Sequence, residues 1–317
     1  MPHLSFKKVN IPTCGDAFSM VPCDTPGCAV LMGASSPYYR MGHPPPDREG
    51  PYCSLVRVTP EGGIRSFGIR DCIVPSDMWG VSVTRMEDGK VLMFGGHHGD
   101  EEAVNSLYTY NMGTNEWTEV PHTEGAPWPQ GKWRHFAFAI GSVLVIGAGV
   151  PSLYHEDWDN DALMATWAYD TETGIWTRLA GYPTPNVYWA SGTLVGDTFH
   201  LIGKFTHMTF SLRDGWTVLC DHDTHTHLGP GQCAVCTIGQ YVVCMGGNGY
   251  TYRTVNAYDT VSGTWEKWAT EGYEDGSGDG CAVPVGGDSI LLRTDGHCYL
   301  VTLNRGAMLP GCIQGEE

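Results

Sequence analysis

The sequence predicts an all-β fold built from six copies of one four-stranded unit. Three observations support this prediction: the composition, a recurring apolar strand that ends near glycine, and a fixed spacing between tyrosine and tryptophan. Of 317 residues, 42 are glycine, and hydrophobic residues make up 42% while charged residues make up only 17%. Long amphipathic helices need a charged outer face, whereas short strands joined by tight turns suit many glycines and few charges. The composition therefore favours strands.

The apolar strand recurs six times along the chain. It reads AVLMG, KVLMFGG, SVLVIGAG, FHLIG, YVVCMGG and SILLR, with reference positions at Gly33, Gly95, Gly147, Gly203, Gly246 and Arg293. These positions step by 62, 52, 56, 43 and 47 residues, a mean of 52. A regular repeat of this length is typical of propellers with four strands per blade. We therefore expect a β-propeller with six blades.

A second, independent spacing marks the hairpin at the end of four of the six units. In three units a tyrosine precedes a tryptophan by seven residues, and these pairs are Tyr110 with Trp117, Tyr169 with Trp176, and Tyr258 with Trp265. Phe210 and Trp216 form a shorter version. Two strands around a polar turn form a β-hairpin. The glycines allow positive φ and close approach between blades, and the aromatic rings fill the wedges between them.

The Gly-Gly after an apolar strand, followed by this Tyr and Trp, resembles the kelch repeat. The resemblance covers nearly the whole chain and is strongest over residues 79–119, 133–179 and 231–268. It implies a six-bladed kelch-type β-propeller that forms one domain over residues 1–317. The expected blades are 14–68, 79–119, 133–179, 187–218, 231–268, and 279–304 together with 4–11.

We expect the N-terminal strand to complete the last blade of this propeller. Only three strands are visible after residue 279, and LSFKKVNI at residues 4–11 is a strand without a unit of its own. If it pairs as the outer strand of the last blade, it closes the ring and removes an exposed edge.

The net charge and the cysteines of the chain indicate which binding partners, location and cofactors to expect. A net charge of −17 repels the phosphates of nucleic acids and anionic membranes, so we expect neither as a partner. No signal peptide and no apolar run near the roughly 20 residues of a membrane helix is visible, which predicts a cytoplasmic protein with reduced cysteines. Cys233 and Cys236 form a Cys-x-x-Cys without a second pair, so we expect no metal and no cofactor.

Long loops are concentrated on one predicted face. In the topology implied by the resemblance, the loops between second and third strands share a face with the connections between blades. These loops are long at residues 34–52, 97–105 and 150–162, and three blades begin with aromatic residues. We therefore expect a ligand at the central mouth on this face. The predicted lining is Tyr39, Arg40, Trp79, His97, Trp133, Arg134, His135, Trp189 and Arg253. Each Trp can alternatively cap the core of its blade.

Two classes of function stay open at this point. The first is a binding module that holds a protein, a peptide or a small-molecule ligand at the mouth. The second is a stand-alone kelch enzyme of the isomerase, epimerase or cyclase type, acting on a sugar or another small anionic substrate at the same place. His97, His135 and Glu156 are the candidates for proton transfer. No nucleophile elbow, phosphate-binding loop or dinucleotide fingerprint is visible.

Overall fold

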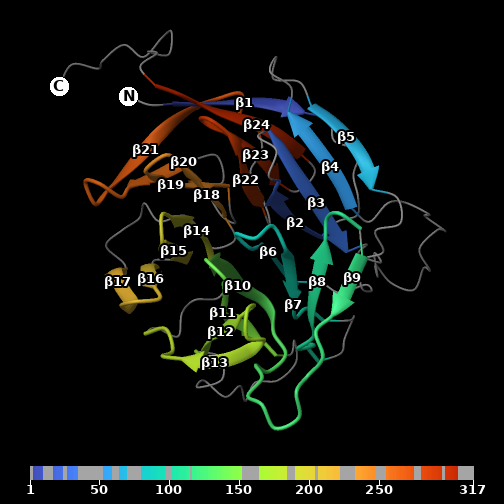
Figure 1. Cartoon of the computed structure of the whole chain (residues 1–317). Coiled ribbons are helices and arrows are strands. Elements are labelled where there is room, and N and C mark those ends of the chain that lie inside the picture. The colour runs from blue at the N-terminus through green and yellow to red at the C-terminus, as the bar shows by residue number, and fades with distance from the viewer. Residues whose placement is uncertain are drawn as a thin grey trace.

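The computed structural model contains only strands and turns in the residues that it describes (Figure 1). These residues are 3–9, 17–23, 27–34, 53–58, 64–69, 80–97, 102–114, 116–151, 164–183, 190–203, 206–221, 233–246, 255–274, 280–294 and 297–305. The all-β prediction is confirmed. No helix of this described part is long and apolar enough to cross a membrane.

The strands group into four-stranded units in chain order. The first three units are β2 (Ala17–Pro22), β3 (Cys28–Ala34), β4 (Cys53–Val58) and β5 (Ile64–Ile69); β6 (Ser82–Arg85), β7 (Val91–Phe94), β8 (Leu107–Asn111) and β9 (Glu116–Glu119); and β10 (Trp133–Ile140), β11 (Val143–Val150), β12 (Thr166–Asp170) and β13 (Ile175–Leu179). The next three are β14 (Ser191–Val195), β15 (Thr198–Gly203), β16 (Thr206–Ser211) and β17 (Gly215–Asp221); β18 (Ala234–Ile238), β19 (Tyr241–Met245), β20 (Val255–Asp259) and β21 (Thr264–Glu271); and β22 (Cys281–Gly286), β23 (Ser289–Thr294), β24 (His297–Asn304) and β1 (His3–Val9).

The hydrogen-bonded sheets agree with six blades. Units one to four are separate antiparallel sheets, and the last two share one eight-stranded sheet with the order β18-β19-β20-β21-β1-β24-β23-β22. The first strands of neighbouring blades adjoin one another in a closed cycle, β2, β6, β10, β14, β18, β22 and back to β2. Figure 1 shows these strands around the centre and the fourth strands at the periphery. The predicted six-bladed propeller is confirmed, and the first strand of each blade is the innermost.

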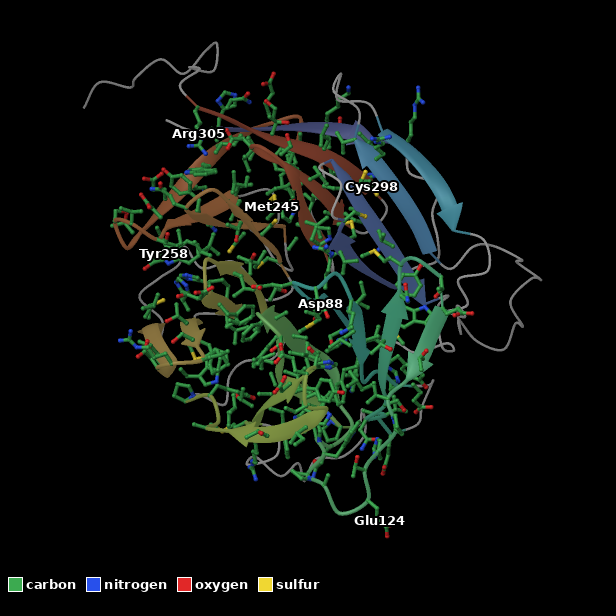
Figure 2. All side chains as sticks on the ribbon, in the orientation of Figure 1. Asp88, Glu124, Met245, Tyr258, Cys298 and Arg305 are labelled. Atoms are coloured by element: carbon green, nitrogen blue, oxygen red, sulfur yellow. The ribbon has the colours of Figure 1, made fainter. Side chains whose placement is uncertain are left out.

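Closure by the N-terminal strand is also confirmed. β1 pairs antiparallel with β24 from His3 opposite Asn304 to Val9 opposite Cys298. In Figure 2 the labels of Cys298 and Arg305 mark the two ends of β24 along which β1 lies. β1 makes a further, parallel pairing with β21 over His3 to Ser5, which the sequence did not predict. The N-terminal strand therefore bonds to two blades at once and joins the fifth to the sixth.

The aromatic residues of the repeat fill the spaces between blades. The rings of Tyr169 and Trp176 are 5.1 Å apart between centroids and belong to a core cluster with Phe94 and Leu107 of the preceding blade. The Nε1–H of Trp216 donates a hydrogen bond to Thr166 Oγ1, again across a blade boundary. The core of the propeller thus lies largely at blade-to-blade interfaces.

Candidate binding site at the start of the third blade

The structure describes four of the predicted site residues and brings all four together. His97, Trp133, Arg134 and His135 lie where β10 begins, beside the end of β7. The others lie outside the described residues, and they are Tyr39, Arg40, Trp79, Glu156, Trp189 and Arg253.

A backbone contact between the second and third blades builds this site. The Gly96 N–H donates to Lys132 O at 2.8 Å, and the Arg134 N–H donates to Gly80 O at 2.9 Å. Gly95 has φ +71°, and a Cβ built on it would lie 2.3 Å from Lys132 O. Only glycine leaves room for this approach, so the Gly-Gly of the repeat determines where the next blade begins.

Trp133 and His97 pack against each other below the surface. Their rings are 4.5 Å apart in an edge-to-face arrangement, and both side chains are buried. The guanidinium carbon of Arg134 lies 4.5 Å from the centroid of the Trp133 ring, within the range of a cation–π interaction. The Arg134 guanidinium therefore packs over the Trp133 ring.

Arg134 has an unusual backbone conformation. With Ala148 it is one of two non-glycine residues with positive φ in the described part, at 56° and 57°. Both lie at the same end of the β10–β11 hairpin, where His135 pairs with Ala148. Such conformations cost about 1–3 kcal/mol each and cluster at functional sites. The Arg134 side chain is half-buried, and its Cγ lies beside Gly80, just before the innermost strand of the preceding blade.

His135 and Lys132 are buried ionisable groups within the same contact. His135 Nε2 and Ser82 Oγ share a hydrogen bond of 2.7 Å. Burial, together with the nearby charge of Lys132, lowers the pKa of His135 to about 3, so the imidazole is neutral at neutral pH. Burial and the charge of Arg178 lower the pKa of Lys132 to about 8. Lys132 is not among the residues predicted from the sequence, although its place between Gly131 and Trp133 was a signal.

This arrangement is suited to holding an anionic group. The half-buried guanidinium of Arg134 is held over the Trp133 ring, where it can donate hydrogen bonds to a carboxylate. In the part of the chain that the structure describes, no group of three or more His, Cys, Asp or Glu side chains could hold a metal ion. Cys233 and Cys236, which form the Cys-x-x-Cys, are free thiols buried in the fifth blade.

The fold and this site define a β-propeller of the repeat type, with a cation at the inner end of a blade. Residues 79–123 match the family model of the Kelch motif. Similar curated proteins are Kelch domain-containing protein 3 of Rattus norvegicus and of Mus musculus, each 28% identical over 133 residues. The matched region covers 41% of this chain and 33% of each relative, so the chain aligns with about a third of their length. Residues 79–123 therefore carry a Kelch motif, and they form part of a β-propeller.

Proposed function

We propose that this kelch-repeat propeller is a protein-binding module whose ligand lies at the central mouth, on the face where the blades begin. The observation that carries the proposal is the placement of Arg134. It lies over Trp133 and beside Gly80, where the inner strands of the second and third blades start. An acidic side chain or carboxylate of a partner peptide is the group that Arg134 is suited to bind.

The charge balance of the chain supports an anionic ligand at this point. The chain has 18 Lys and Arg against 35 Asp and Glu. A cation that is held in place at the inner rim therefore concentrates a positive field where the rest of the surface repels acidic groups. A half-buried guanidinium is also screened less than an exposed one.

The buried histidines favour binding over the enzyme alternative. His97 and His135 are both packed inside the blade contact. A general base works best when its pKa lies near the operating pH, and the pKa of His135 is lowered to about 3. His97 and His135, two of the three candidates for proton transfer, are therefore better suited to packing than to acid–base catalysis.

The test uses a random displayed library of ten-residue peptides, selected on the intact chain. We expect the selected peptides to carry Asp, Glu or a free carboxylate. Arg134→Ala should weaken them by about 1.5–3 kcal/mol, the range for a hydrogen bond to a charged group. Arg305→Ala is the matched control, because Arg305 is exposed and paired with Asp288 at 2.8 Å. Equal affinity of the wild-type chain and Arg134→Ala, at equal melting temperature, would reject the proposal.

A further inference from the structure

We infer that the outer edge of β17 is a second docking surface, which accepts an extended basic segment of a partner protein as an additional strand of the fourth blade. β17 ends its sheet among the described strands and lies at the periphery of the molecule (Figure 1). Its edge is therefore a row of backbone donors and acceptors without a strand partner in that part of the chain.

Before its last residue, Asp221, β17 lacks the charges that comparable outer strands carry. Between Gly215 and Cys220 it contains no Asp, Glu, Lys or Arg. The other outer strands that end their sheets have exposed charged side chains at Arg65 in β5, Glu116 and Glu119 in β9, and Arg178 in β13. Such charges normally prevent further strands from adding to an edge. Their absence leaves β17 open to strand addition.

A β-bulge places apolar side chains on this edge strand. His207 pairs with Cys220 and Met208 pairs with Val218, so Leu219 has no residue opposite it on β16. Val218 is 39% exposed and Leu219 is 43% exposed, although neighbouring residues of a regular strand alternate between faces. Leu212, in the turn before β17, is 47% exposed. Three of the five well-exposed large apolar side chains in the described residues thus belong to this one hairpin.

The chemistry of the edge and the charge of the chain identify the occupant. Only an extended segment satisfies a row of strand N–H and C=O groups, and apolar side chains at alternate positions of that segment would cover Val218 and Leu219. The molecule already uses this mode once, since β1 adds to β21 as a parallel strand. A second copy of this chain would bring another −17 charges to the edge, whereas a basic segment is attracted.

The experiment uses three synthetic nine-residue peptides with blocked ends: KVTVKVTVK, its acidic counterpart EVTVEVTVE, and KVTPKVTVK, in which proline removes a backbone donor. We expect the basic peptide to bind by fluorescence polarisation and to slow amide exchange of residues 217–220. The acidic and proline peptides should bind at least about tenfold more weakly. If the basic peptide fails to bind the wild-type chain, or binds no better than the acidic one, the inference is wrong.

Matched variants separate this surface from the mouth. Leu219→Lys introduces an edge charge and should weaken the basic peptide by about tenfold, as should Thr217→Lys if the first variant is poorly folded. Val261→Lys is the control, because Val261 is 78% exposed in the β20–β21 turn. Arg134→Ala should leave this binding unchanged, so the two sites can fail separately. A dimer of the wild-type chain that Leu219→Lys abolishes would assign the edge to a second copy and overturn the inference.

Discussion

The Nδ1 atom of His200 lies 2.9 Å from the Nε2 atom of His207, and both rings are buried. The two residues lie on neighbouring strands of the fourth blade and contact Tyr258 of the fifth, whose label marks this side of the molecule in Figure 2. One ring nitrogen must donate and the other must accept, so the bond requires that the accepting nitrogen carry no proton.

This pair predicts loss of stability in acid. Burial lowers the pKa of His200 to about 4, and burial with the charge of His200 lowers that of His207 to about 3, both below the usual 6.5. Between the unfolded and folded pKa values the unfolded chain binds more protons, so the free energy of unfolding falls as pH falls from about 6.5 towards 4. The slope is about 1.4 kcal/mol per pH unit for each buried histidine. Urea unfolding at pH 7, 6 and 5 measures this dependence of the free energy of unfolding on pH.

His207→Phe is the variant that isolates this effect. It removes one titrating group, so the slope between pH 6.5 and 4 should decrease by about 1.4 kcal/mol per pH unit. At pH 7 the variant should lose about 1–3 kcal/mol, because Nδ1 of His200 is left buried without that bond. An unchanged pH slope would show that His207 titrates normally in the folded chain.

Leu4 should contribute strongly to stability through ring closure. Its side chain is fully buried in a cluster with Trp268 of the fifth blade and Tyr299 of the sixth. Leu4→Ala should cost about 2–5 kcal/mol, the range for truncating a buried leucine. Lys7→Ala in the same strand is the control and should stay within about 0.5 kcal/mol, because Lys7 is exposed. Equal melting temperatures for the two variants would contradict a structural role for β1.

Gly95 should be far less replaceable than Gly141. Both have positive φ, +71° and +59°, so alanine strains the backbone at either position. A Cβ at Gly95 would lie 2.3 Å from Lys132 O, whereas a Cβ at Gly141 meets nothing within 4 Å. We expect about 1 kcal/mol for Gly141→Ala and at least about 2 kcal/mol more for Gly95→Ala. Similar unfolding energies would mean that the two blades do not meet at Gly95.

The fold could be predicted because its repeat is local. Each Gly-Gly marks the end of a strand within one blade, and each Tyr–Trp spacing marks a hairpin. The last blade has only three strands of its own in the sequence, so the N-terminal strand could be assigned to it. The parallel pairing of β1 with β21 could not be predicted in this way. It depends on where the end of β21 lies relative to the neighbouring blade, which no short segment encodes.

The candidate site could be predicted only in part. The sequence placed Trp133, Arg134 and His135 at the start of a blade and predicted that they line the mouth, with core capping as the alternative for Trp133. The structure buries Trp133 and His135 and leaves Arg134 half-buried, because this depends on how the backbone of residues 132–134 docks on Gly80 and Gly96. The bulge at Leu219 likewise arises from strand pairing and has no signal in the sequence.

The pairing of β1 with β24 also has a consequence for protein synthesis. The side-chain hydrogen bond between His3 and Asn304 joins residues 301 positions apart. At translation rates of about 5–20 residues per second, the first strand waits roughly 15–60 s for its partner to be made. Until then Leu4 and Phe6 can meet only the part of their core that the fifth blade supplies, and the nascent propeller is an open arc whose end strands have exposed edges. A ribosome that stalls before residue 297 would therefore release an aggregation-prone chain, although five of its blades can already be complete.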